Sequence, residues 1–178
     1  MSMRKAGALA IALLAACGPS GSAAPAGPGL GAVATAEEIA GWDISIPPDG
    51  SGLPPGAGTP KAGAPIFAAK CASCHGEHGE GLSAEELVGG IGSLTSDNPA
   101  LTVGSYWPYA TTLFDYVRRA MPPEAPFSLS ADEIYAVSAY ILYLNGIVGA
   151  DDELNAKTLP AVKMPNRDGF IQVYRESK

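Results

Sequence analysis

The sequence predicts a mainly α-helical domain with long loops, because two segments show helical amphipathicity and no convincing hairpin pattern is present. The clearer segment starts at Ser130, where Ser130-Ala131-Asp132-Glu133 has the Ser-x-x-Glu form of a capping box. Four apolar residues then recur on one stripe: Ile134, Val137, Ile141 and Leu144. Asn145-Gly146 ends this pattern and so marks the end of the helix.

The second amphipathic segment covers residues 109–120. Its apolar face consists of Leu113, Phe114, Val117 and Ala120. We expect three charged residues to face mostly outward: Asp115, Arg118 and Arg119. A third, short helix is expected over residues 62–74, and the glycines from Gly76 onward end it.

The chain begins with the pattern of an export signal. Arg4 and Lys5 precede an apolar run, which at roughly a dozen residues is too short for a membrane-spanning helix. The run ends in Leu14-Ala15-Ala16-Cys17, which resembles a bacterial lipobox. The sequence therefore predicts a lipoprotein-type signal peptide at residues 1–16 and lipid modification of Cys17. The alternative is an ordinary signal peptide that is cut within residues 18–26.

The composition divides the remaining chain into a tether and one domain. Residues 17–36 consist almost entirely of Gly, Ala, Pro and Ser, a composition that cannot bury apolar surface. Residues 37–178 have the size of a single domain. The formal charge is −7, and loss of Arg4 and Lys5 with the signal peptide makes it −9. This acidity argues against nucleic-acid binding and favours a partner with a basic patch.

The chemistry of the chain lies in the block Lys70-Cys71-Ala72-Ser73-Cys74-His75. Two thiols at the Cys-x-x-Cys spacing can each add to one vinyl group of haem, and the histidine that follows can bind the iron. Only one such motif occurs in the sequence, so we expect one covalent haem c. Export is consistent with this expectation, because haem is attached after translocation.

Three other interpretations of the motif are weaker. A redox dithiol is expected beside a βαβ pattern, and none is visible. A zinc site made of Cys71, Cys74, His75 and His78 is disfavoured, because the adjacent Cys74 and His75 cannot easily reach one tetrahedral ion. A disulfide between Cys71 and Cys74 closes so short a loop that it would stabilise the fold little.

A haem iron bound by His75 needs a sixth ligand for electron transfer or an open face for ligand chemistry. We favour Met121 as the sixth ligand, because Pro122 ends the preceding helix and presents the thioether from an extended segment. Met ligation also raises the reduction potential. Met164, which also precedes a proline, is the alternative ligand, although it could equally be a core side chain. His78 lies too close to His75 along the chain and is expected on the surface.

These motifs resemble class I cytochrome c over residues 60–146. The resemblance rests on Cys71-x-x-Cys74-His75, on Met121-Pro122 and on the last helix through Ala139-Tyr140-Ile141. It implies the single-haem class I fold, with thioether bonds at Cys71 and Cys74 and axial ligands at His75 and Met121. Residues 37–59 and 147–178 then extend this core on both sides.

A narrower resemblance covers most of the domain. The chain is similar to the cytochrome subunit of bacterial sulfane dehydrogenase and its sulfite-dehydrogenase relatives in four segments: Trp42-Asp43, 52–59, 102–112 and 164–170. This resemblance implies an electron-transfer protein that is not an enzyme on its own. Its donor would be a molybdenum-cofactor dehydrogenase subunit, and its acceptor another cytochrome or an oxidase, in the periplasm. The chain has one haem motif where larger members have two.

Some residues in these segments have two interpretations. Tyr106, Trp107 and Tyr109 either surround the haem or are ordinary core aromatics. Arg118 and Arg119 either neutralise a propionate, contact a partner or complement the helix dipole. Residues 147–178 either wrap the domain or meet the catalytic partner.

The sequence is also compatible with two other functions. The first is a haem enzyme or gas-binding cytochrome with an open distal site, although no motif places a distal His or Arg beside the iron. The second is a general membrane-tethered electron shuttle that has no connection with sulfur compounds.

Overall fold

The computed structural model describes residue 27, residues 30–171 and residue 173. The export signal, Cys17 and most of the tether therefore lie outside the described residues. The described elements, in chain order, are α1 (Ala36–Trp42), β1 (Ala57–Gly58), α2 (Pro60–Lys70), α3 (Ala72–His75), the 3-10 helix η1 (Ser93–Thr95), α4 (Ala110–Ala120), α5 (Ala131–Leu144), β2 (Leu154–Asn155) and the 3-10 helix η2 (Leu159–Ala161). Among the described residues, no helix is both long and apolar enough to cross a membrane.

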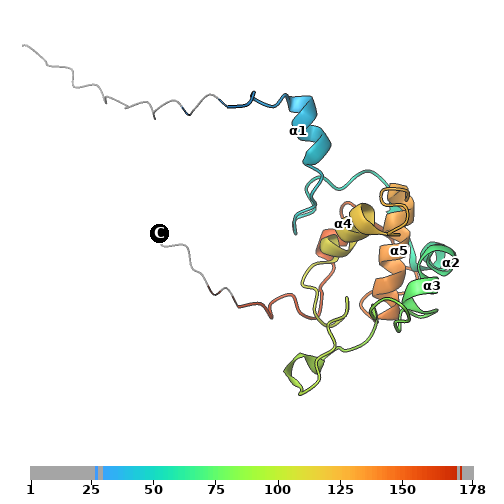
Figure 1. Cartoon of the computed structure of the whole chain (residues 1–178). Coiled ribbons are helices and arrows are strands. Elements are labelled where there is room, and N and C mark those ends of the chain that lie inside the picture. Colours follow the sequence, from blue (N-terminus) through green and yellow to red (C-terminus); the bar gives the residue numbers. More distant parts are fainter. Residues whose placement is uncertain (1–26, 28–29, 172, 174–178) are drawn as a thin grey trace, which may run out of the picture.

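Helix α5 lies at the centre of the fold, and its prediction from the capping box is confirmed. The Ser130 hydroxyl accepts a hydrogen bond from the Glu133 backbone N–H, and the Glu133 carboxylate accepts one from the Ser130 backbone N–H. Most residues of α5 are buried, because α2 and α4 pack on it from two sides (Figure 1). This arrangement gives the mainly helical fold that the sequence predicts.

Two glycines let the backbones of neighbouring elements approach α5 closely. A Cβ atom added to Gly63 of α2 would lie 1.9 Å from the Ala136 carbonyl oxygen. One added to Gly58 of β1 would lie 2.1 Å from the Ala136 backbone nitrogen. No larger residue fits either position without movement of the backbone, so these glycines set the spacing between α5 and the N-terminal half of the core.

The helix expected over residues 62–74 is two helices. Helix α2 begins earlier, with Thr59 as its N-cap and Pro60 at its first position, and it ends at Lys70. Cys71 has non-helical backbone angles, φ −124° and ψ −38°, and the short helix α3 follows it. The chain therefore turns at the first cysteine of the motif, a change of direction that an amphipathic pattern does not reveal.

Helix α4 lies where it is expected, but one of its charged residues does not face outward. Asp115 is only 7% exposed. Helix η2 of the C-terminal extension packs against α4 and so covers a second face of it. One Asp115 oxygen accepts a hydrogen bond from Arg119, while the other is buried without a partner among the described residues. The outward prediction for Asp115 is therefore wrong, because periodicity within one helix cannot anticipate a second covering segment.

The residues after α5 return to the N-terminal part of the domain, where they pair with β1. Strand β2 pairs with β1 in antiparallel register, with Ala57 opposite Asn155 and Gly58 opposite Leu154. Leu154, Leu159 and Met164 then bury their side chains in the core. The first half of the C-terminal extension is therefore part of the fold and not a loose appendage.

Helix α1 is different, because it stands apart from the other helices (Figure 1). All seven of its residues are described, and none is buried. Its N-terminus is formed by a second capping box, in which Thr35 and Glu38 exchange hydrogen bonds. The chain thus builds a compact core and, before it, a helix that has no packing partner within the described residues.

Candidate haem-binding site

The residues of the Cys-x-x-Cys-His motif share one cavity with Met121. The cavity has a volume of about 380 Å³, and Cys71, Cys74, His75 and Met121 all line it. Its other walls are mainly apolar side chains from α4, α5 and the loops before and after α4: Val103, Leu113, Val117, Leu129, Val137 and Ile141. The fold thus brings together all four residues that the sequence selects for haem binding.

The two cysteines are free thiols: Cys71 lies at the turn between α2 and α3, and Cys74 lies within α3. Burial raises the pKa of the Cys71 thiol to about 11, and this effect outweighs the nearby positive charge of Lys70, while Cys74 raises the pKa further. Redox-active dithiols depend on a cysteine with a lowered pKa. The environment of Cys71 therefore disfavours the redox-dithiol interpretation.

His75 is oriented by a backbone carbonyl. Its Nδ1 atom lies 2.9 Å from the Glu85 carbonyl oxygen. A carbonyl only accepts hydrogen bonds, so Nδ1 carries the proton and donates it. The other ring nitrogen, Nε2, then keeps the lone pair that a metal ligand needs. The loop that contains Glu85 therefore fixes the orientation of this ring.

Backbone hydrogen bonds fold that loop back on the motif. The Gly81 N–H donates to the His75 carbonyl at 2.7 Å, and the Ala84 N–H donates to the Cys74 carbonyl at 2.9 Å. Gly81 has a φ of +87°, a conformation that suits glycine at this turn. These bonds place Glu85 beside His75.

The far end of the same loop is fixed by Asn145, which follows α5 and is buried. Its Nδ2 group donates to the Leu87 carbonyl at 3.2 Å and to the Ile141 carbonyl at 2.9 Å. Its Oδ1 atom accepts a hydrogen bond from the Gly89 N–H at 3.1 Å. Asn145 therefore connects the end of α5 to the loop that orients His75. The sequence pattern identifies it only as a helix stop.

Thr102 extends this connection to the loop before α4. Its hydroxyl donates to the Gly89 carbonyl at 2.6 Å and accepts from the Gly104 N–H at 3.1 Å. A Cβ atom on Gly104 would lie 2.1 Å from Asn145 Oδ1, so Gly104 leaves room for the asparagine. One polar network therefore holds three segments that surround the cavity.

Met121 lies at the end of α4, as the proline pattern predicts. The helix ends at Ala120, and Met121 has extended backbone angles, φ −123° and ψ 142°. Its partly buried side chain packs on the core and lines the cavity. Met164 is buried elsewhere, in the C-terminal extension, and is not among the cavity residues. The geometry therefore favours Met121 over Met164 as a ligand.

His78 lies outside the cavity. It is exposed, and its backbone N–H donates to the Glu80 carboxylate at 2.7 Å. It is a surface residue, as expected, and it does not join the two cysteines and His75 as the zinc interpretation requires.

The three aromatic residues before α4 have separate environments. Trp107 lines the cavity and forms an edge-to-face pair with Tyr116, with ring centroids 5.7 Å apart. Tyr106 packs against Phe170, and the Arg167 guanidinium lies 4.4 Å from the centre of the Tyr109 ring. Of the three, only Trp107 is a cavity residue. The other two attach the C-terminal extension.

The arginines of α4 are not cavity residues. Neither Arg118 nor Arg119 lines the cavity, and Arg119 forms an ion pair with Asp115. Their position in the last turn of α4 complements the helix dipole. A role on a haem propionate has no support in this arrangement.

The cavity fits a haem by the chemistry of its lining. Its apolar walls suit the flat face of a macrocycle, two thiols line it, and one imidazole and one thioether are available as iron ligands. This donor set is that of a c-type cytochrome.

Comparison with known proteins agrees with this chemistry. Residues 58–141 match the family of cytochrome c oxidase, cbb3-type, subunit III. The crystal structure of the sulfane dehydrogenase SoxCD from Paracoccus pantotrophus contains a chain that is 48% identical, with a TM-score of 0.75, and the match covers 81% of this chain and 71% of that chain. The chain belongs to the c-type cytochrome family of sulfane dehydrogenase.

As a c-type cytochrome, this protein carries covalently bound haem c and serves as an electron-transfer component that is not catalytic on its own. The predicted class I fold is confirmed. A search among curated proteins gives no match.

Proposed function

We propose that this cytochrome binds one haem c and transfers electrons in the oxidation of a sulfur compound in the periplasm. Cys71 and Cys74 would hold the haem covalently, and His75 and Met121 would bind the iron. The donor would be a molybdenum-dependent dehydrogenase subunit, and the acceptor another cytochrome or an oxidase. When bound, the haem supplies a one-electron Fe(III)/Fe(II) couple.

The observation that carries this proposal is that His75 and Met121 line the same apolar cavity although they lie on distant parts of the chain. The Glu85 carbonyl holds the His75 ring in the tautomer that leaves Nε2 free. Met121 offers a soft thioether, which suits the ferrous state, and the apolar lining excludes water. These features favour a six-coordinate iron with a raised potential.

The ligand assignment is tested by two methionine variants of the holoprotein. We expect Met121→Ala to lower the reduction potential strongly and to abolish the weak red absorption of ferric iron bound to a thioether. Met164→Ala serves as the control, because it removes a buried methionine that is not in the cavity. If Met164→Ala has the effects expected of Met121→Ala, the assignment is wrong.

The sulfur-compound donor is tested with the purified molybdenum-bearing catalytic subunit from the same organism. The ferric cytochrome is mixed with this subunit and a reduced sulfur compound, and reduction is followed in the visible spectrum. We expect reduction that depends on both additions. If the cytochrome stays ferric while a general electron acceptor is reduced, the proposed donor is wrong.

We also propose that the protein is anchored to a membrane by a lipid on Cys17, on the basis of the lipobox-like residues 14–17. Cys17→Ser is expected to move the protein from the membrane fraction to the soluble periplasmic fraction, as measured by haem staining of both. Unchanged retention of this variant in the membrane fraction would contradict the anchor.

A further inference from the structure

Helix α1 exposes apolar side chains that nothing in the described part of the chain covers. Trp42 is 88% exposed and Ile39 is 52% exposed. The two residues are three positions apart, so they lie on one face of the helix. Together with Val33 and Ala34 they line an open hollow. An exposed tryptophan beside other apolar groups is typical of a protein-binding surface.

The length of α1 points in the same direction. It has seven residues, and a helix shorter than about 12 residues is marginal in water without tertiary packing. The capping box of Thr35 and Glu38 stabilises its first turn by only about 1 kcal/mol. A lasting helix at this position therefore needs a surface that covers Ile39 and Trp42.

The charge around α1 indicates what kind of surface that is. Between Cys17 and Pro60 the sequence contains four acidic residues and no Lys, Arg or His. The acidic residues are Glu37, Glu38, Asp43 and Asp49. The capping hydrogen bonds lower the pKa of Glu38, so it is ionised at neutral pH. An anionic lipid surface would repel this segment, whereas a protein groove with an apolar floor and basic rim is complementary to it.

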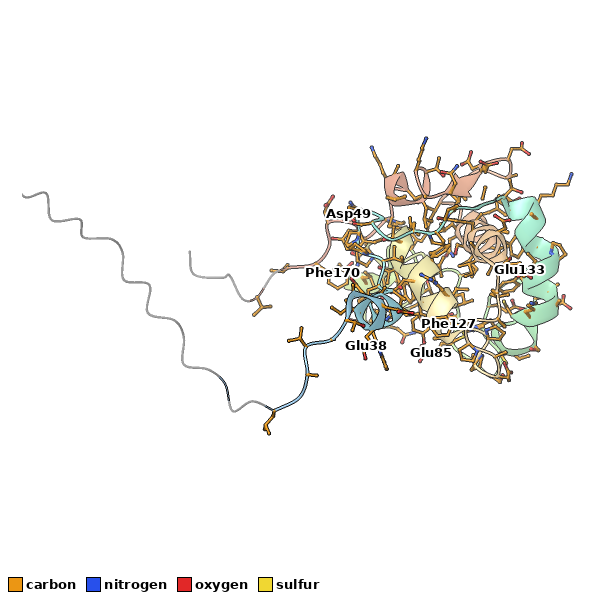
Figure 2. The ribbon with its side chains drawn as sticks, turned by 90° about the horizontal axis from the view of Figure 1, so that it is seen from above. Glu38, Asp49, Glu85, Phe127, Glu133 and Phe170 are labelled. Atoms are coloured by element: carbon orange, nitrogen blue, oxygen red, sulfur yellow. The ribbon has the colours of Figure 1, made fainter. Side chains whose placement is uncertain are left out.

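We propose that α1 is a docking helix that binds such a groove on the catalytic subunit of the dehydrogenase. This proposal rests on the proposed function, which supplies that subunit as the donor. The family match covers only residues 58–141, whereas the similarity to a chain of SoxCD covers 81% of this chain. The similarity to the dehydrogenase therefore extends beyond the residues of the family match. Glu38 and Phe170 lie on the same side of the core, where both terminal segments leave it (Figure 2). Docking through α1 leaves the haem cavity residues free of this contact, since α1 contributes none of them.

The test measures binding of the full-length holoprotein to the purified molybdenum-bearing catalytic subunit from the same organism. We expect Trp42→Ala to weaken binding by at least about tenfold. Glu37→Lys is expected to weaken binding at low salt and less at high salt. Leu82→Ala is the matched control, because Leu82 is 76% exposed and lies outside both α1 and the cavity lining. All variants should keep the visible spectrum of the parent protein.

The outcomes separate the docking helix from the proposed function. If the parent protein binds the catalytic subunit and Trp42→Ala binds equally well, the docking helix is wrong and the proposed function stands. If the parent protein does not bind, the docking helix is overturned, and the reduction assay alone decides on the proposed function. Two further measurements test whether α1 binds something other than the catalytic subunit. Loss of self-association in Trp42→Ala would indicate that α1 binds a second copy of this chain. Binding of α1 to phosphatidylglycerol vesicles that Trp42→Ala abolishes would indicate a membrane. Either result would overturn the assignment to the catalytic subunit.

Discussion

The two extensions of the cytochrome core differ in how the core uses them. The C-terminal extension pairs β2 with β1 and buries Leu154, Leu159 and Met164. The N-terminal extension forms α1, an equally regular element with none of its residues buried. The comparison teaches that regular local structure and integration into a core are separate properties. Capping residues can start a helix, but only long-range packing makes it part of the fold.

A pair of glycine substitutions tests this difference with the largest expected effect. A Cβ atom at Gly63 would lie 1.9 Å from the Ala136 carbonyl oxygen, whereas one at Gly41 in α1 would meet nothing within 4 Å. We expect Gly63→Ala to lower the free energy of unfolding by about 3 kcal/mol. Gly41→Ala should leave it unchanged, since α1 does not pack on the core. Guanidinium unfolding of both holoproteins measures the difference, and equal effects would contradict the account.

A second substitution tests the hydrogen-bond network by which Asn145 holds the loop beside His75. Asn145→Leu removes the hydrogen bonds to Leu87 and Gly89, which we expect to cost about 2 kcal/mol. The loop with Glu85 then holds His75 less firmly, and a weaker bond at Nδ1 reduces the basicity of the ligand. The reduction potential should therefore rise. Asn98→Leu, at an exposed position, is the control. A potential that stays constant while stability falls would show that Asn145 has a structural role alone.

The two capping boxes provide the smallest and most closely matched comparison. Ser130→Ala removes the cap of α5 and should cost about 1 kcal/mol, whereas Thr35→Ala removes the same motif from α1 and should cost the core nothing. The cap hydrogen bonds lower the pKa of Glu133 in the folded protein. Its contribution is therefore present above the ordinary glutamate pKa and is lost as pH falls through the lowered value. Thermal unfolding between about pH 3 and pH 7 should show this acid-sensitive contribution in the parent protein and a smaller one in Ser130→Ala, because alanine keeps the backbone N–H that donates to Glu133 but lacks the hydroxyl. An equal loss of stability in Ser130→Ala and Thr35→Ala would contradict the difference between the two extensions.

Much of the site could be predicted because its signals are local. The attachment motif is one run of six residues, the capping box spans four, and Met121 directly precedes the proline that ends its helix. Each of these depends on neighbours along the chain, so the sequence alone reveals it.

The remaining features depend on contacts between distant segments. Asn145 bonds to a loop that is more than 50 positions away in the sequence. Asp115 is buried on α4, and the C-terminal extension packs on this helix at a place that no helical pattern predicts. The strands β1 and β2 have two residues each, too few for an alternating pattern.

The most direct measurement is a visible spectrum of the purified holoprotein, ferric and dithionite-reduced, with and without carbon monoxide. The account predicts that carbon monoxide leaves the reduced spectrum unchanged, because Met121 occupies the sixth position of an iron held by His75. A rapid spectral shift on addition of carbon monoxide would mean an open iron, and it would contradict the assignment of this cytochrome as a six-coordinate electron carrier.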